Sequence, residues 1–205
     1  MITLASYIDH TILKPTTTHI EIEKICREAV EYGFAAVCVP PPLVPDAVRL
    51  LIRGGVSGTG VANGGNGVKV ATVIGFPFGY STVKAKVAEV EQAMADDADE
   101  LDIVINPVAL REGRWSLLEE EMRLLTKRAH AGKRLVKVII ESGILSDEEI
   151  IRCCQVYSGV GVDFLKTSTG YAEKGATVSA VRLMRQYLPA GIRIKASGEI
   201  GRAHV

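Results

Sequence analysis

Residues 134–170 read RLVKVIIESGILSDEEIIRCCQVYSGVGVDFLKTSTG, and this stretch decides the fold class. Its two ends, 134–140 and 162–168, are short β-branched runs that are apolar almost throughout, as in strands covered on both faces of a parallel sheet. Between them, Ser146 with Glu149 three residues later is a capping-box signal for the start of a helix. A strand, a helix and a second strand in this order predict one βαβ unit.

The same alternation runs through the rest of the chain. Five further runs read as strands, at residues 7–13, 35–39, 68–76, 100–106 and 191–197. Apolar residues recur at helical intervals in residues 20–33, 81–98 and 115–130. Seven strands with no reversal of pattern, and no Gly-rich phosphate turn after the first, favour a (β/α)8 TIM barrel of the α/β class over an open doubly wound sheet.

Length and composition favour a single barrel domain over residues 1–205, since 205 residues, 47% of them hydrophobic, suit one sizeable core. Residues 53–67 hold seven glycines and predict a plain loop before the third strand. A phosphate cradle is the alternative, but the segment approaches a strand at the barrel face opposite to such sites. The chain stops at GRAHV after the seventh strand, so we expect the eighth strand and its helix to be missing.

Charge and cysteine content indicate which classes of binding partner and which cellular compartment to expect. Lys plus Arg equals Asp plus Glu at 24 each, so no basic excess indicates a nucleic-acid partner. No apolar stretch approaches the ~18–20 residues of a membrane span, and the start of the chain lacks the pattern of a signal peptide. The four cysteines show no zinc-ligand spacing and read as packed, reduced thiols. We therefore expect a cytoplasmic protein.

A few charged residues lie where this fold builds active sites, at the C-terminal ends of strands. Asp102 is embedded in the fourth predicted strand, and Lys166 and Lys195 close the sixth and seventh. For any one of them, a structural ion pair inside the barrel is an equally good interpretation. Two lysines and a carboxylate from three strands together indicate amine catalysis.

The chemistry depends on a lysine that loses its proton. A free lysine, with a pKa of about 10.4, is protonated at neutral pH and is no nucleophile. Burial and a second nearby cation both lower the pKa of an amine, so one lysine of a close pair is expected to titrate near neutrality. Its neutral amine attacks a carbonyl and yields an iminium, while an ammonium and a carboxylate relay protons. The small residues after each lysine leave room for substrate, and loops after late strands usually hold phosphate.

At this point the sequence resembles the family of deoxyribose-phosphate aldolases, class I enzymes that use no metal or other cofactor. The resemblance covers nearly the whole chain, in the family's order. It is carried by IDHTILKP (8–15), AAVCVPP (35–41), KVATVIGFPFG (69–79), ELDIVIN (100–106), LVKVIIE (135–141), DFLKTSTG (163–170) and IKASG (194–198). It implies that Lys166 is the Schiff-base nucleophile, that Lys195 lowers its pKa, and that Asp102 transfers protons.

The implied reaction is the reversible cleavage of 2-deoxy-D-ribose 5-phosphate into D-glyceraldehyde 3-phosphate and acetaldehyde. The resemblance places Asp9, Thr169, Gly170 and Gly198 along the substrate pocket and suggests a homodimer. Four further residues are not assigned to substrate binding or catalysis. Cys38 is taken as a packed thiol, Lys137 as a candidate member of the polar network, Glu141 as a structural partner and His10 as a hydrogen-bonded structural residue.

The resemblance breaks near the C-terminus. Family members follow the seventh-strand lysine with a Gly-Gly pair, whereas Gly198 is followed here by Glu199, whose carboxylate would repel a phosphate. With the eighth strand missing as well, we expect the chain to be a truncated or frameshifted member of the family whose phosphate-binding site is impaired. Three hypotheses stay open: an active aldolase, a catalytically impaired barrel fragment acting at most as a binding or interaction protein, and a Schiff-base lyase for another aldehyde.

Overall fold

The structure of the protein is a computed structural model that describes residues 4–52 and 67–198. The chain forms two compact units. One comprises the described residues up to Val73 together with Gln92–Leu101, and the other comprises Ile74–Glu91 together with the described residues from Asp102 onward. The single-domain organisation expected from the sequence stays a prediction.

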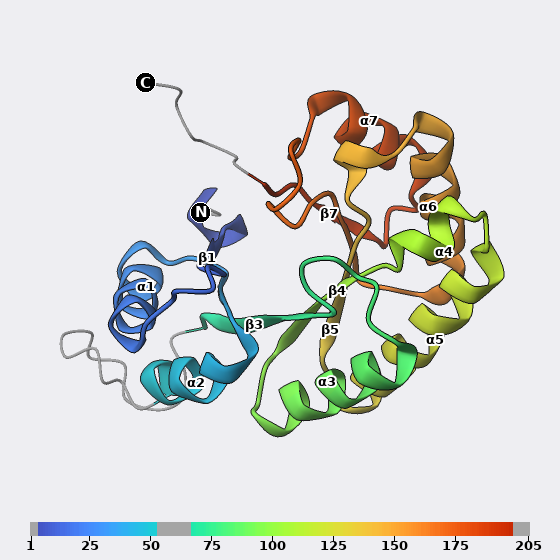
Figure 1. The fold of residues 1–205 in the computed structure, drawn as a ribbon. Coiled ribbons are helices and arrows are strands. Elements are labelled where there is room, and N and C mark those ends of the chain that lie inside the picture. The colour runs from blue at the N-terminus through green and yellow to red at the C-terminus, as the bar shows by residue number, and fades with distance from the viewer. Residues whose placement is uncertain (1–3, 53–66, 199–205) are drawn as a thin grey trace. The chain divides into compact units, whose positions relative to one another are not determined.

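Seven strands alternate with helices along the chain (Figure 1). They are β1 (Asp9–Thr11), β2 (Ala36–Val39), β3 (Lys69–Ile74), β4 (Glu100–Val104), β5 (Leu135–Ile139), β6 (Phe164–Lys166) and β7 (Arg193–Lys195). The strands hydrogen-bond in chain order, from β1 to β7. The pairs β1–β2, β2–β3, β5–β6 and β6–β7 are parallel. All seven predicted strands and the α/β class are confirmed.

The helices follow the strands. They are α1 (His19–Tyr32), α2 (Val44–Ile52), α3 (Val83–Ala95), α4 (Pro107–Arg111), α5 (Trp115–Ala131), α6 (Asp147–Val160) and α7 (Val178–Tyr187). Three short 3-10 helices are η1 (Leu4–Tyr7), η2 (Pro41–Leu43) and η3 (Ser142–Ile144). The predicted helices correspond to α1, α3, α5 and α6. The sequence analysis missed α2, α4 and α7, which are nine, five and ten residues long.

The predicted capping box of α6 is present. The hydroxyl of Ser146 accepts the N–H of Glu149 at 3.2 Å, and the carboxylate of Glu149 accepts the N–H of Ser146 at 2.8 Å. At its other end, Gly161 closes the helix with a φ of 82°, in the left-handed region that glycine adopts without strain. The local signals therefore fix both ends of the helix that connects β5 to β6.

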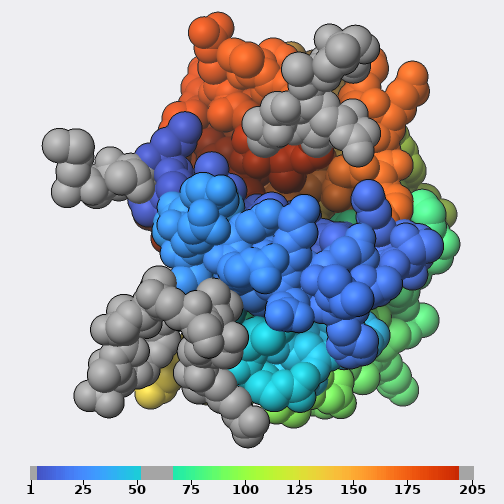
Figure 2. Space-filling view, turned by 90° about the vertical axis from the view of Figure 1, so that its left-hand side faces the viewer, coloured from blue at the N-terminus to red at the C-terminus, as the bar shows by residue number. Residues whose placement is uncertain are grey.

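In the first unit, β1, β2 and β3 carry the helices α1 and α2, which pack against each other and lie side by side on the surface in Figure 2. Cys38 on β2 is fully buried, as predicted for a packed thiol. Nε2 of His10 lies 2.7 Å from Oε2 of Glu28, so His10 is the hydrogen-bonded residue that the sequence indicated. Asp9 begins β1 in register with Ala36.

In the second unit, the strand register decides at which height along the sheet the charged side chains lie. Lys166 at the end of β6 pairs with Lys195 at the end of β7. On the other side, Ile139 of β5 pairs with Lys166. Because parallel strands end at the same edge of a sheet, these register pairs bring the two lysines to one level.

The second unit also holds a buried ion pair that the sequence analysis missed. Nζ of Lys86 on α3 donates to Oε2 of Glu121 on α5 at 3.2 Å and to the carbonyl of Val104 at 2.8 Å. Both charged side chains are essentially inaccessible to solvent. Burial lowers the pKa of Lys86 and raises the pKa of Glu121. The pair joins two helices to the end of β4.

The loop after β3 rests directly on the end of β4. Gly79 has a φ of 73°, and a Cβ atom added there would lie 1.9 Å from the carbonyl oxygen of Ile105. Only glycine therefore allows this approach of main chain to main chain. The loop carries Pro77 and Phe78, which reappear in the site described below.

Two sequence-based expectations fall on residues that are not described. Of the predicted loop at 53–67, only Gly67 lies within the described residues. Glu199 and the terminal GRAHV lie outside them as well. Residues 4–52 and 67–198 contain no eighth strand. Within the same ranges, no helix combines the length and apolar character that crossing a membrane requires.

We predict that Gly79→Ala destabilises the protein much more than Gly161→Ala. Both glycines have positive φ, so each alanine costs about 1 kcal/mol of conformational strain. Gly161 has open space around its Cβ position, whereas Gly79 faces the Ile105 carbonyl. The clash adds about 2 kcal/mol for Gly79→Ala. Urea denaturation of both variants measures the difference, and equal losses would contradict the close packing of this loop.

Candidate active site

A fully buried carboxylate lies at the centre of the candidate site. Oδ2 of Asp102 on β4 accepts hydrogen bonds from Nζ of Lys166 at 2.6 Å and from Nζ of Lys195 at 3.3 Å. Its other oxygen, Oδ1, accepts one from Nζ of Lys137 on β5 at 2.9 Å. The structure thus brings together the three residues predicted as catalytic, and it adds Lys137 to the network.

The carboxylate is ionised because of its neighbours. Asp102 is fully buried, and burial alone would raise its pKa, but the ammonium groups of Lys137, Lys166 and Lys195 outweigh this effect and hold the pKa of Asp102 well below its usual range. The lysines are themselves largely withdrawn from water. The exposed fraction is 2% for the side chain of Lys137, 4% for Lys166 and 14% for Lys195. Lys195 is therefore on the more open side of the cluster.

The cluster differs from an ordinary structural ion pair in the number of amines around one carboxylate. Lys86 and Glu121 match one cation with one anion, whereas three lysines surround Asp102. The arrangement places a candidate amine nucleophile within hydrogen-bond distance of a carboxylate that also binds two further amines, which are groups that amine catalysis can use for proton transfer.

The segments that follow Lys166 and Lys195 are hydrogen-bonded to each other. The N–H of Thr167 donates to the carbonyl of Lys195 at 3.0 Å, and the N–H of Ser197 donates to the hydroxyl of Thr167 at 3.0 Å. The hydroxyl of Ser197 donates to the carbonyl of Ser168 at 2.6 Å. These bonds fix the two lysine-bearing strand ends relative to each other.

Three glycines bring the same loops into contact. Gly170 and Gly198 have φ values of 86° and 84°. A Cβ atom on Gly198 would lie 3.6 Å from Cα of Gly170, and one on Gly175 would lie 2.0 Å from the carbonyl oxygen of Gly198. Within the described part of the chain, the N–H of Gly170 donates to no protein acceptor. The turn therefore presents a free backbone donor, of the kind that binds anions.

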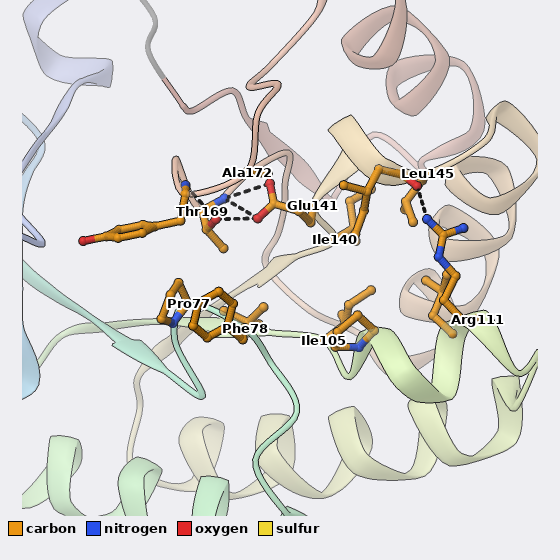
Figure 3. Close-up of a pocket in the computed structure, with 14 residues that line it drawn as sticks. Pro77, Phe78, Ile105, Arg111, Ile140, Glu141, Leu145, Thr169 and Ala172 are labelled. Carbon is orange, nitrogen blue, oxygen red and sulfur yellow. Dashed lines mark hydrogen bonds between the residues drawn. The ribbon is translucent and has the colours of Figure 1, made fainter.

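Thr169 faces a different partner. Its hydroxyl and its N–H both donate to the carboxylate of Glu141, which follows β5 (Figure 3). Asp9 belongs to the first unit, and its place along the pocket stays a prediction. The sequence analysis regarded Glu141 as a structural partner without identifying what it binds. Its bond to a residue 28 positions later leaves no spacing signal in the sequence.

A mostly apolar cavity of about 180 Å³ adjoins this contact. Glu141 and Thr169 line one side, and Pro77 and Phe78 from the loop after β3 line the opposite side (Figure 3). Arg111 on α4 closes one end and donates to the carbonyl of Ile144. Among the described residues, no three His, Cys, Asp or Glu side chains gather as they would around a metal ion.

Comparisons with known proteins agree on one family. The model of the DeoC/LacD family of aldolases matches residues 3–198. The deoxyribose-phosphate aldolase of Streptococcus gordonii is 46% identical over 195 residues, which are 95% of this chain and 82% of that protein. The corresponding protein of Thermococcus gammatolerans is 44% identical over 197 residues, which are 96% of this chain and 83% of that protein.

A solved structure supports the fold. The deoxyribose phosphate aldolase from Aeropyrum pernix, described as a tetramer, is 30% identical and superposes with a TM-score of 0.83. The match covers 96% of this chain and 78% of that one. The predicted barrel fold class is confirmed, with seven β-strands among the residues that the structure describes.

We predict that Asp102→Asn lowers the free energy of unfolding by about 3–5 kcal/mol near pH 7, because it leaves buried ammonium groups without their counter-charge. The folded pKa of Asp102 lies below its unfolded value of about 3.9. Its contribution is therefore present above that unfolded value and is lost as the pH falls through the folded pKa. Urea denaturation at a series of pH values tests this.

The difference between the wild type and Asp102→Asn is expected to persist down to about pH 4 and to narrow below it. Glu120→Gln serves as the control, since it removes a carboxylate from an exposed position. A difference that already vanishes at about pH 5 would show that Asp102 is not held ionised by its neighbours.

Proposed function

The chain belongs to the DeoC/LacD family of aldolases, and we propose that it is a class I deoxyribose-phosphate aldolase. It reversibly cleaves 2-deoxy-D-ribose 5-phosphate into D-glyceraldehyde 3-phosphate and acetaldehyde. One observation carries the proposal within this chain: the Nζ atoms of Lys166 and Lys195 bind the same oxygen of a buried, ionised carboxylate, Asp102. This set of groups suits Schiff-base chemistry.

Lys166 is the proposed nucleophile. Its Nζ is nearest to the carboxylate, and a proton leaving Lys166 has Oδ2 of Asp102 as an acceptor 2.6 Å away. The neutral amine then attacks C1 of the open-chain sugar and gives a carbinolamine. Protonation of its hydroxyl group and loss of water produce the iminium, which withdraws electrons from the C2–C3 bond. Lys195 and Asp102 are the nearest groups that can supply and accept these protons.

Cleavage follows from the iminium. A base takes the proton of the C3 hydroxyl, the C2–C3 bond breaks, and its electron pair moves into the iminium to give an enamine. C3 becomes the aldehyde carbon of D-glyceraldehyde 3-phosphate, which leaves. The enamine then takes a proton at C2, and water hydrolyses the resulting iminium to release acetaldehyde and restore Lys166.

The phosphate end of the substrate is assigned to the glycine turns. The N–H of Gly170 has no acceptor among the described residues, and Gly170 lies next to Gly198 at the ends of the two lysine-bearing segments. Backbone N–H groups in such turns are suited to anions. Thr169 and Asp9 complete the proposed binding residues.

The alternative is a catalytically impaired barrel that only binds a partner. It was suggested by Glu199 and by the end of the sequence, both outside the described residues. The aldolase is favoured because the relatives named above are aldolases matched over most of their length, and because the cluster around Asp102 is complete.

We predict that acetaldehyde and borohydride together attach one ethyl group to Lys166, because borohydride reduces the iminium to a stable amine. Intact mass spectrometry and peptide mapping locate the adduct. Lys166→Met is expected to abolish it, and Lys127→Met, which removes an exposed lysine, is expected to leave it unchanged. An adduct spread over surface lysines, with Lys166 unmodified, would reject the assigned nucleophile.

Release of D-glyceraldehyde 3-phosphate from 2-deoxy-D-ribose 5-phosphate tests the substrate itself, in an assay coupled to a dehydrogenase. Lys166→Met is expected to lower kcat by at least about 10⁴-fold. An adduct on Lys166 without turnover of this sugar phosphate would favour a Schiff-base lyase for another aldehyde. Neither an adduct nor turnover would favour the binding protein.

The assembly state and the compartment complete the proposal. We propose a homodimer, as the family resemblance suggests, although the relative from Aeropyrum pernix is a tetramer. Light scattering during size-exclusion chromatography measures the mass. The cysteines are free and buried, as is usual in a reducing compartment, and this supports the cytoplasmic location.

A further inference from the structure

We propose that Glu141 is a positioning residue, whose carboxylate shapes the turn after Lys166 so that the turn binds the phosphate-bearing end of the substrate. The inference rests on the function proposed above and adds a residue to it. Glu141 touches neither the lysine cluster nor the reacting carbon atoms in the proposed scheme. It acts through Thr169 and Gly170.

The carboxylate of Glu141 restrains the turn at several atoms. Both of its oxygens lie 3.3 Å from the N–H nitrogen of Thr169, and one of them accepts the hydroxyl proton of Thr169 (Figure 3). The same hydroxyl oxygen accepts the N–H of Tyr171 at 3.1 Å. One side chain therefore fixes the residues on both sides of Gly170, whose φ is 86°.

The backbone of Glu141 is held in an unusual conformation. Its φ and ψ are 54° and 56°, in the left-handed region that non-glycine residues rarely adopt. Two bonds flank it: the N–H of Ile140 donates to the carbonyl of Lys166 at 3.0 Å, and the N–H of Ser142 donates to the carbonyl of Thr167 at 2.7 Å. Strained residues that persist because their surroundings hold them are concentrated at functional sites.

A strained backbone alone would favour glycine at this position. The presence of glutamate is explained if the carboxylate is needed, since the left-handed conformation aims it at Thr169. The donors of Thr169 are thereby occupied by Glu141, whereas the N–H of Gly170 forms no hydrogen bond within the described residues. The carboxylate thus holds the turn in a shape that leaves this one donor available to an anion.

The positioning role predicts different effects on two parts of the reaction, the binding of the phosphate group and the chemistry at Lys166. Loss of the carboxylate is expected to loosen the turn and to weaken binding of the phosphate group, while the amine of Lys166 keeps its contact with Asp102. A purely structural role predicts a different result, in which stability and all steps of the reaction decline together. Substrates with and without a phosphate group distinguish the two.

The key variant is Glu141→Gly, which removes the carboxylate and also relieves the backbone strain. We expect KM for 2-deoxy-D-ribose 5-phosphate to rise roughly ten- to a hundredfold with little change in kcat, as for misplacement of a binding group. Turnover of unphosphorylated 2-deoxy-D-ribose and trapping of acetaldehyde on Lys166 should stay at their wild-type levels. Glu141→Gln retains one acceptor for Thr169 and should restore most of the affinity.

Two controls accompany these variants. Glu120→Ala removes an exposed carboxylate and is expected to behave as the wild type. Thr169→Val removes the hydroxyl partner, and its effect on KM should not add to that of Glu141→Gly because both break the same contact. Thermal denaturation of every variant reports whether the fold has been lost, and Glu141→Gly is expected to keep its melting temperature.

Binding without turnover provides the decisive measurement. In a Lys166→Met background, calorimetry gives the Kd of 2-deoxy-D-ribose 5-phosphate with and without Glu141→Gly. A ten- to hundredfold weaker Kd supports the positioning role. An unchanged Kd, or equal losses for phosphorylated and unphosphorylated sugars, would overturn it. A wild type that turns over no sugar phosphate would instead reject the proposed function, so the two failures are distinct.

Discussion

The second unit depends on one buried carboxylate. Asp102 has no access to water and satisfies three ammonium groups from β5, β6 and β7 with its two oxygens. Without its charge, three cations would face each other in a region that solvates charge poorly, and burial of the lysines would be prohibitively costly. The carboxylate therefore lets the strand ends converge with their lysines pointing inward. The fold and the proposed chemistry share this single requirement.

The protein contains two kinds of buried charge, and their comparison is informative. The pair of Lys86 and Glu121 is balanced and links helices to β4, as a structural ion pair does. The cluster around Asp102 instead gathers three amines on one carboxylate, at the ends of β5, β6 and β7. This convergence at the strand ends, rather than the presence of lysine in the core alone, supports the proposal of a reactive amine.

The sequence predicted the strands and the grouping of Asp102, Lys166 and Lys195, because β-branched apolar runs repeat regularly and strand-end charges are rare in this chain. Their individual roles remain predictions. Other features escaped for physical reasons. Helix α7 has only ten residues, and its buried apolar repeat, Ala180 and Met184, spans little more than one turn after the N-cap at Thr177. The bond from Glu141 to Thr169 joins loops whose approach depends on the left-handed backbone of Glu141, which the sequence does not signal.

The contact between Gly175 and Gly198 has a consequence for protein engineering. A Cβ atom on Gly175 would lie 2.0 Å from the carbonyl oxygen of Gly198, and the clash involves main chain that cannot rotate away. Randomised libraries intended to broaden the range of accepted aldehydes would therefore recover only glycine at position 175. Diversity is better introduced at Phe78 and Tyr171, whose side chains are about half exposed and border the apolar cavity.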